Sequence, residues 1–258
     1  MRAIILAAGR GARLSQSPGA HLPKCLLRFG QLSLLERHLR LLHAAGVQEV
    51  VLGVGFEHPL VEAELARLAA QGLPRAEVFL NERFTLGSVL TVHVTADALC
   101  RGGDVLLMDA DVLYDERIMR ALTGGAAPSN RILIDREFEA GDEPVKVCVQ
   151  DGIPVELRKQ VTAGLRYDTI GESVGFFRFD ERAARRLADM VADYVATGRE
   201  HLPHEETVRD LILERSQVFS IVDVTGAPWI EIDFPADVER AATEVLPQLS
   251  SLSGVAAA

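Results

Sequence analysis

The sequence lacks three features that would each assign it to a particular class of protein. None of its apolar runs approaches the ~20 residues that a membrane-spanning helix needs. The first apolar run is interrupted by Gly9 to Arg13, too early for the apolar region of a signal peptide. The three cysteines lie far apart, without the spacing of a zinc site or a disulfide framework. These absences predict a soluble, cytoplasmic protein with no membrane partner and no structural zinc.

Positive charge is also scarce. The chain has 27 lysines and arginines against 37 aspartates and glutamates, a formal net charge of -10. A nucleic-acid-binding surface requires a basic face, so we expect no nucleic-acid partner. There are only one tryptophan and three tyrosines, few side chains for an aromatic cage around a quaternary ammonium group. An acidic protein that handles phosphates needs a metal ion or local basic groups.

Short β-rich runs alternate with segments of helical periodicity through the first half of the chain. The expected strands are 3–8, 49–54, 76–80, 104–109 and 131–135, and the expected helices are 33–45, 58–71, 88–99 and 115–122. Near-continuous apolar strands separated by amphipathic helices predict an α/β fold of the Rossmann-like class, with a mixed, mainly parallel sheet flanked by helices. Ligands of such sheets bind at the carboxyl ends of the strands.

The pattern changes after about residue 140. Strands are expected at 145–150, 153–158, 174–179, 218–224 and 229–233, and helices at 180–197, 203–216 and from Pro235 onward. Asp151-Gly152 is typical of a hairpin turn, so the first three of these strands predict an antiparallel, β-rich excursion. Because no linker indicates a boundary, we predict a single domain, 1–249, in two parts, about 1–135 and 136–249, followed by a flexible tail, 250–258.

A glycine-rich, cationic loop, 5-ILAAGRGARL-14, follows the first expected strand. A dinucleotide-binding G-x-G-x-x-G would need a glycine where Leu14 stands and an acidic residue about 20 positions on, and neither is present. A P-loop, G-x-x-x-x-G-K-[ST], occurs nowhere in the sequence. Small residues allow close backbone approach to a ligand, and Arg10 and Arg13 oppose negative charge. A simple tight turn does not account for both arginines, so the loop favours a triphosphate cradle.

Two further motifs place carboxylates at strand ends. In 107-LMDADVLYD-115, Asp109 and Asp111 come directly after an apolar strand, which is typical of a hard-oxygen site for Mg²⁺. Asp115 is expected to cap the next helix. In 229-WIEIDFPADVERA-241, Asp233 ends a strand and Asp237 begins the following helix, where a carboxylate meets the positive end of the helix dipole.

The pattern L-A-A-G-x-G-x-R-L, with Pro23-Lys24 downstream, resembles the N-terminal signature of the nucleotidylyltransferase superfamily. The resemblance implies a GT-A-like fold in which Lys24 and Arg13 hold the phosphates. It implies that Asp111 and Asp233 bind Mg²⁺. Nucleotide contacts are implied for Leu6, Ala7, Ala8, Gly9, Arg10, Gly11 and Asp109. The sequence departs from the signature at Ala12, where Ser or Thr is common, and in 15–22, which is about one residue longer than usual.

Later segments resemble the bacterial phosphocholine cytidylyltransferase group, which includes relatives acting on 2-aminoethylphosphonate. They are 143-EPVKVCVQDGIPVELRKQ-160, 171-GESVGFFRF-179 and 204-HEETVRDLI-212. The resemblance implies that CTP binds the part before about 135 and that a small phosphate- or phosphonate-bearing acceptor binds the part after it. The implied nucleotide contacts also include Asn81 and Ser88, and the implied acceptor contacts are Lys146, Lys159, Glu172 and Trp229. Glu205 and Glu206 are further candidates to face a cationic acceptor group, and the seven histidines are assigned to surface or packing positions.

The predicted reaction is a nucleotidyl transfer in which an acceptor oxygen attacks the α-phosphorus of CTP and pyrophosphate leaves. Because the nucleophile is already anionic, no general base is required, and catalysis rests on positioning and charge neutralisation. The main alternative is a sugar-1-phosphate nucleotidylyltransferase using CTP, UTP or dTTP. A nucleotide-sugar glycosyltransferase, a molybdopterin-type guanylyltransferase and a catalytically silent nucleotide-binding module are weaker alternatives. The identity of the acceptor and the oligomeric state, a homodimer included, stay open.

Overall fold

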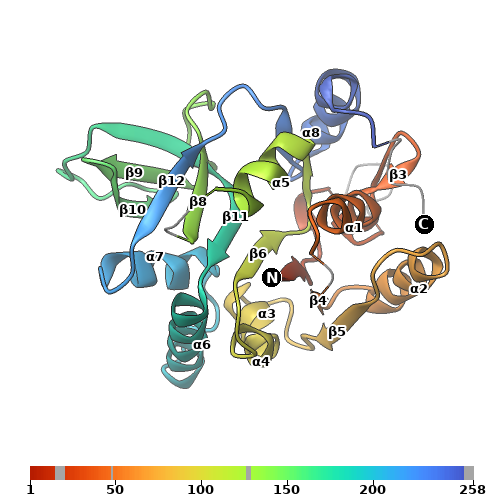
Figure 1. Ribbon diagram of the computed structural model, residues 1–258, viewed down its shortest axis with the longest axis horizontal. Helices are drawn as coiled ribbons and strands as arrows, with labels where there is room; N and C mark the ends of the chain where they lie inside the picture. Colours follow the sequence, from red (N-terminus) through yellow and green to blue (C-terminus); the bar gives the residue numbers. More distant parts are fainter. Residues whose placement is uncertain (15–20, 48, 126–128, 253–258) are drawn as a thin grey trace.

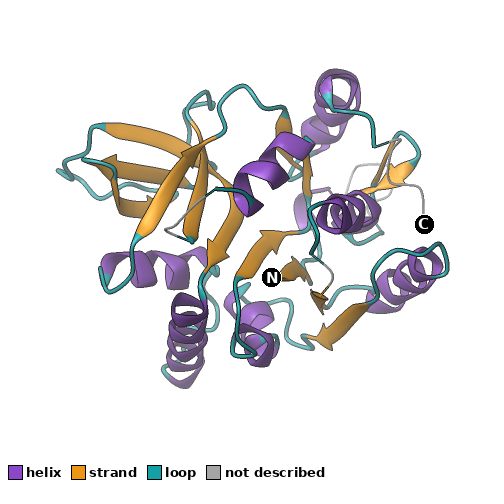
Figure 2. Ribbon diagram, in the orientation of Figure 1, coloured by secondary structure: helices purple, strands orange, loops and turns teal. Residues whose placement is uncertain are grey.

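A nine-stranded mixed sheet forms the centre of the protein in the computed structural model, which describes residues 1–14, 21–47, 49–125 and 129–252 (Figures 1 and 2). Its strands are β1 (Arg2–Ala7), β4 (Glu49–Val54), β5 (Ala76–Leu80), β6 (Val105–Asp109), β8 (Asn130–Asp135), β9 (Lys146–Gln150), β10 (Ile153–Arg158), β11 (Thr169–Phe179) and β12 (Phe219–Asp223). They run in the order β10-β9-β11-β6-β1-β4-β5, and β8 pairs with β11 and β12. Two small ribbons pair β2 (Arg28–Phe29) with β3 (Leu32–Ser33) and β7 (Val112–Tyr114) with β13 (Trp229–Glu231).

Helices cover both faces of this sheet, as the sequence predicted. The helices are α1 (Leu34–Ala44), α2 (His58–Ala69), α3 (Val89–Val94), α4 (Ala96–Leu99), α5 (Glu116–Thr123), α6 (Glu181–Ala196), α7 (Glu205–Leu213) and α8 (Pro235–Arg240). Strand β1 pairs in parallel with β4 and β6, and β4 with β5. The predicted α/β class with a mixed, mainly parallel sheet is confirmed. No helix of the described residues is long and apolar enough to cross a membrane.

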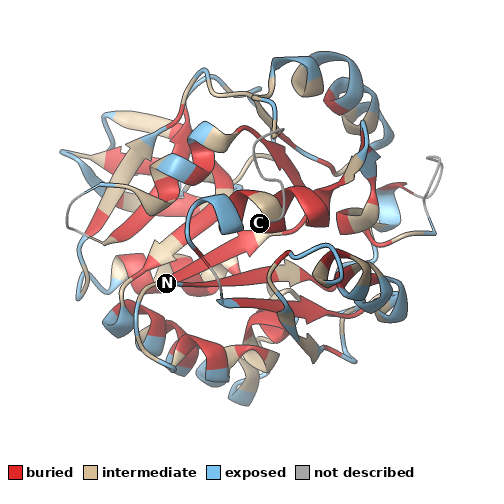
Figure 3. Ribbon diagram, turned by 45° about the vertical axis from the view of Figure 1, so that its right-hand side comes forward, coloured by how far each residue is buried: buried red, intermediate tan, exposed pale blue. Residues whose placement is uncertain are grey.

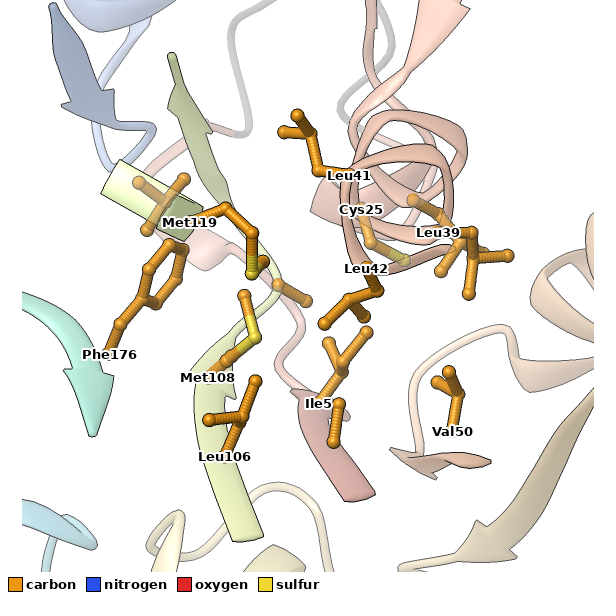
Figure 4. Packing of buried hydrophobic residues seen from close by; sticks show 14 of the residues in the cluster. Ile5, Cys25, Leu39, Leu41, Leu42, Val50, Leu106, Met108, Met119 and Phe176 are labelled. Atoms are coloured by element: carbon orange, nitrogen blue, oxygen red, sulfur yellow. The ribbon is translucent and has the colours of Figure 1, made fainter. Parts of the chain in front are cut away.

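Alternate residues of β1 enter two different hydrophobic clusters, because successive side chains of a strand point to opposite faces. Ile5 packs with residues of α1, α2 and α5, among them Leu39 and Met119 (Figure 4). Ile4 packs on the other face with residues of α3, α4, α6 and α7. Figure 3 shows the buried strands between helices whose outer sides are exposed. The central strands are therefore packed on both faces.

Most predicted boundaries lie within two residues of the observed ones, and the differences have local causes. The expected helix 88–99 is divided between α3 and α4, and Thr95 at the break donates its hydroxyl to the carbonyls of Thr91 and Val92. The expected capping box of α1 is half formed. Ser33 Oγ accepts from the Glu36 amide at 3.1 Å, but the Glu36 carboxylate pairs with arginines instead of returning to the Ser33 backbone.

Strand β11 begins five residues earlier than predicted and opens the sheet where β6 ends. On one edge, residues 169–172 pair with β9 and residues 176–179 pair with β6. Gly175 lies between these two ladders with φ +76°, and a Cβ there would stand 2.5 Å from Asp109 Oδ2. Only glycine fits that backbone conformation and that close approach. The gap between β9 and β6 leaves space for a ligand at the carboxyl end of β6.

The C-terminal segment returns to the domain. The Ser250 amide donates to Asp115 Oδ2 at 2.7 Å, and Leu252 packs against the cluster that contains Ile5. The described part of the predicted flexible tail is therefore attached, and its remaining residues, 253–258, lie outside the described residues. Most of the irregular segment 15–22 lies outside them as well.

Candidate active site

The β7–β13 ribbon brings together carboxylates that are more than a hundred residues apart in the sequence. Glu231 is opposite Val112 in the antiparallel register, and the Ile232 amide donates to the Asp111 carbonyl at 3.0 Å. Asp111, Glu231 and Asp233 each offer an oxygen within 4.8 Å of the others. Carboxylate oxygens at this spacing match the donor set of a hard divalent cation. Desolvation in the cleft, followed by the charges of Asp111 and Asp233, raises the pKa of Glu231 well above its ordinary value.

The ammonium group of Lys24 lies between two of these carboxylates. Its Nζ donates to Asp111 Oδ2 at 2.8 Å and to Asp233 Oδ1 at 2.7 Å. Burial alone would lower the pKa of Lys24, but the two carboxylates outweigh it and raise that pKa above its ordinary value. Gly11, at φ +62°, lies against the lysine stem, and a Cβ there would stand 3.0 Å from Lys24 Cγ. The glycine-rich loop therefore leaves room for a charged lysine over the acidic cluster.

Arg13 connects the same cluster to the second half of the chain. Its guanidinium bonds to Asp233 Oδ2 at 2.8 Å and to Glu143 Oε2 at 2.9 Å, and it stacks over the Phe234 ring. Glu143 also accepts from Lys159 Nζ at 3.0 Å. Hydrogen bonds from Lys159 and Arg13 lower the pKa of Glu143. Glu143 therefore connects Arg13, predicted to bind phosphate, to Lys159, predicted to bind the acceptor.

A cleft of about 330 Å³ opens beside these charges. Of the predicted site residues, ten line it: Leu6, Ala8, Gly9, Arg13, Ser88, Asp109, Asp111, Lys159, Glu205 and Asp233. They come from the end of β1 and the loop after it, the residue before α3, the end of β6 and the turn after it, the residue after β10, the start of α7 and the segment after β13. These segments lie far apart in the sequence. Burial, followed by the nearby Glu205 and Asp111 carboxylates, raises the pKa of Asp109 well above its ordinary value.

A larger pocket of about 800 Å³ adjoins the cleft and shares Glu143, Glu231 and Asp233 with it. Glu172 and Trp229, both predicted acceptor ligands, line this pocket. Half of its lining residues are acidic, and the lining also includes Phe138, Phe234, Arg136 and Arg240. The pocket is negative and partly aromatic, in contrast to the cationic loop that precedes Lys24.

Glu172 forms no ion pair among the described residues, although it lies opposite Lys146 in the β9–β11 ladder. It lies opposite Asp135 in the β8–β11 ladder, and Asp135 accepts from Trp229 Nε1 at 2.8 Å. Burial and the Asp135 charge raise the pKa of Glu172 to about 7. The ionised form of Glu172 is therefore disfavoured in the folded chain near neutral pH.

Because the pKa of Glu172 is raised on folding from an ordinary 4.5 to about 7, its ionisation destabilises the fold as pH rises through that window. We expect Glu172→Gln to increase the free energy of unfolding at pH 8 by about 1–2 kcal/mol, a value reduced for partial exposure. The gain should vanish near pH 4.5. Urea unfolding at both pH values measures it, with the exposed Glu137→Gln as control. Equal gains at both pH values would contradict the assignment.

Several predicted residues lie outside the cleft. Ala7 is in the core, Arg10 is exposed, and Asn81 is buried, donating to Thr91 and accepting from the Arg83 amide. Lys146 Nζ donates to the carbonyls of Gly141, Pro144 and Lys159. Glu206 pairs with Arg158. The roles predicted for these side chains stay predictions, and Lys159 has the more open position for an acceptor phosphate.

The structure adds three residues that sequence reasoning missed. Glu231 could have been found, because it is two residues before Asp233 and alternate strand residues share a face. Glu143 carried no such signal. His204, assigned to a surface or packing position, packs against Phe177 and also lines the cleft, with its side chain 3% exposed. Its position results from the packing of α7, which no local pattern reports.

A glycine-rich loop after the first parallel strand, with a lysine and an arginine over carboxylates at the strand ends, defines a nucleotidyltransferase-type α/β domain. The chain belongs to the family of MobA-like NTP transferase domains, whose sequence profile matches residues 3–169. The predicted superfamily is therefore confirmed.

Curated relatives cover nearly the whole chain. The chain is 28% identical over 95% of its length to a bifunctional IPC transferase and DIPP synthase of Rubrobacter xylanophilus, and spans 52% of that relative. It is 22% identical over 93% of its length to the CTP:phosphoglutamine cytidylyltransferase of Campylobacter jejuni, 98% of which is covered. It is 25% identical over 93% of its length to a CMP-5'-(3-aminopropyl)phosphonate synthase of Streptomyces rubellomurinus, 38% of which is covered.

Solved structures share the fold. The inositol-1-phosphate CTP transferase of T. maritima superposes with a TM-score of 0.77 at 20% identity, over 100% of this chain and 98% of that one. The CTP:phosphocholine cytidylyltransferase of Streptococcus pneumoniae superposes with a TM-score of 0.73 at 18% identity, over 93% of this chain and 97% of that one. The predicted GT-A-like architecture is confirmed by these likenesses.

Proposed function

We propose that the chain transfers a cytidylyl group from CTP to a small acceptor carrying a phosphate or phosphonate, with Mg²⁺ and with release of pyrophosphate. The observation that carries this proposal is a set of ion pairs at the edge of the cleft. Lys24 pairs with Asp111 and Asp233, and Arg13 pairs with Asp233. Two fixed cations and two carboxylates at the mouth of a glycine-rich loop form a site for a triphosphate and its counter-ion. The named substrates of the relatives favour CTP.

Asp111, Asp233 and Glu231 would hold the ion, since three carboxylate oxygens within 4.8 Å of one another fit a hard cation. A divalent ion there would supply charge neutralisation for the triphosphate and the leaving pyrophosphate. Lys24 and Arg13, released from Asp111 and Asp233, are then free to donate to phosphate oxygens. The carboxylates thus hold both cations in place before the nucleotide arrives.

The transfer forms one bond and breaks one bond. An acceptor oxygen attacks the α-phosphorus, and the bond from that phosphorus to the oxygen bridging to the β-phosphorus breaks in line. The electron pair leaves with pyrophosphate, whose charge Lys24 and Arg13 oppose. The attacking oxygen is already anionic, so no residue has to remove a proton from it.

The acceptor would lie across the boundary between the cleft and the larger pocket. Lys159 lines the cleft and is the candidate ligand of the acceptor phosphate, with Lys146 behind it on the neighbouring strand. Glu172 and Trp229 would face the far end of the acceptor in the acidic pocket.

A pyrophosphate-release screen tests this function. CTP, UTP, dTTP and GTP are each combined with phosphocholine, 2-aminoethylphosphonate, inositol 1-phosphate and hexose 1-phosphates in the presence of Mg²⁺. We expect release with CTP and one or more of the first three acceptors, and none after addition of EDTA.

Two outcomes would overturn the proposal in different directions. Release only with hexose phosphates and UTP or dTTP would indicate a sugar-1-phosphate nucleotidylyltransferase. Nucleotide binding without release from any pair would indicate a catalytically silent module.

A further inference from the structure

Nε2 of His204 is a buried polar atom in the wall of the cleft that has no hydrogen-bond partner among the described residues. His204 directly precedes α7, and its side chain is 3% exposed. Buried polar atoms in native structures are hydrogen-bonded with few exceptions, so an orphan of this kind requires an explanation. Its place in the wall of a cleft points to a partner that is not part of the protein.

The ring of His204 is held in one orientation. The backbone amide of His204 donates to Ser88 Oγ at 2.8 Å, and Nδ1 lies 3.1 Å from that same oxygen and 3.1 Å from Glu205 Oε2. The ring also meets Phe177 edge-on, with 6.4 Å between centroids. Nε2, on the other side of the ring from Nδ1, lies 3.9 Å from Asp109 Oδ1, too far for a hydrogen bond.

The pair formed by His204 Nε2 and Asp109 selects one kind of ligand group. An Asp109 carboxyl oxygen accepts a hydrogen bond, whereas Nε2 donates in one neutral tautomer and accepts in the other. A carbonyl or phosphate oxygen only accepts and an ammonium group only donates, so each can bond to both side chains in some protonation states of the pair and not in others. A hydroxyl group both donates and accepts, so one hydroxyl between the two side chains can bond to both in either tautomer.

We propose that His204 and Asp109 form a subsite for a hydroxyl group of the substrate, with Ser88 positioning the histidine ring. This inference rests on the proposed function. It deepens that function, since it makes His204 a specificity-determining residue of the same cleft. The hydroxyl comes either from the ribose of the nucleotide or from a polyol acceptor.

Nucleotide binding tests the ribose source without any turnover. The dissociation constants of CTP, 2′-deoxy-CTP and 3′-deoxy-CTP are measured by calorimetry with Mg²⁺ for the wild type, His204→Phe and the half-buried control His58→Phe, which lies outside the cleft. We expect one deoxy analogue to bind the wild type about tenfold more weakly than CTP, the size of one hydrogen bond. In His204→Phe, CTP should bind no better than that analogue, and the control should keep the wild-type ratio.

Acceptor binding tests the other source. Inositol 1-phosphate, which has hydroxyl groups, and phosphocholine, which has none, are titrated into protein saturated with α,β-methylene-CTP and Mg²⁺. If the acceptor supplies the hydroxyl, His204→Phe weakens the binding of inositol 1-phosphate about tenfold relative to that of phosphocholine. The ratio of the dissociation constants of CTP and its deoxy analogues then stays as in the wild type.

Ser88→Ala keeps the test decisive if the buried ring of His204 cannot be replaced. Loss of the Ser88 hydroxyl removes the hydrogen-bond partner of Nδ1. It should therefore reduce the preference for the hydroxyl-bearing ligand by a smaller factor than His204→Phe does, about threefold. A purely structural serine would lower thermal stability without changing discrimination between CTP and its deoxy analogue. If both variants keep the wild-type ratios of dissociation constants, in the nucleotide experiment and in the acceptor experiment, the subsite is overturned. If the ratios change but no nucleotide and acceptor pair releases pyrophosphate in the screen, only the proposed function is rejected.

Discussion

Lys24→Ala should lower turnover ~10²–10³-fold, the cost of removing one preorganised charge from a transition state. Lys24 is the cation held closest to the carboxylate cluster, at 2.8 and 2.7 Å from Asp111 and Asp233. Its charge opposes the negative charge that develops on the leaving pyrophosphate, so its loss should change kcat far more than the affinity for CTP. We expect the dissociation constant of CTP to change less than about tenfold.

The same substitution should increase the affinity of the nucleotide-free protein for Mg²⁺. Without the ammonium group, Asp111 and Asp233 face each other with no cation between them, so the variant should bind Mg²⁺ more tightly in the absence of nucleotide. Calorimetric titration with Mg²⁺ measures this, and steady-state pyrophosphate release measures kcat. Arg120→Ala, which breaks an exposed pair with Glu116, is the matched control. Near-normal turnover in Lys24→Ala would show that another group holds the phosphates.

Asp233→Asn should reduce turnover ~10²–10⁴-fold, since its carboxylate would serve as an ion ligand and also fixes both cations before the nucleotide binds. Asp233 Oδ1 accepts from Lys24 and Oδ2 from Arg13. Among the described residues the Asp111 side chain hydrogen-bonds only to Lys24, so Asp111→Asn should retain the orientation of Arg13. Both variants remove one formal negative charge from the proposed ion site. The Mg²⁺ concentration for half-maximal activity should therefore rise in both.

Pyrophosphate release over a range of Mg²⁺ concentrations separates the two aspartates. Asp97→Asn, which alters an exposed carboxylate paired with Arg101, controls for the loss of charge alone. If Asp233→Asn kept the wild-type rate and the wild-type Mg²⁺ requirement, the cluster would not be the ion site.

Local patterns in the sequence were sufficient for most of the secondary structure. Strands 49–54 and 76–80 were predicted with their observed limits, because each is a short apolar run between turn residues. The turn at Asp151-Gly152 was also predictable, and both residues have positive φ. The unexpected length of β11 has a different origin. Its early residues pair with β9, and that pairing depends on a neighbouring strand instead of on a local signal.

The candidate site was predictable in its charged parts and less so elsewhere. Lys24, Asp111 and Asp233 belong to motifs that can be read in short windows, and the structure brings all three together. Asn81 and Lys146 were also predicted as ligand contacts from the resemblance, but both have internal hydrogen-bond partners. A sequence window shows which groups can bind a ligand. It does not show which of them the surrounding chain already satisfies.

The sequence by itself determined the class of fold, the cationic loop and the carboxylates at the strand ends, because each is a local pattern of residue types. Only the tertiary structure decided that Glu231 joins the cluster through the β7–β13 ribbon and that the sheet opens beside Gly175. It also decided that His204 faces Asp109 across the cleft. Those contacts join segments that are separated in the sequence, and their geometry results from the pairing and packing of whole elements.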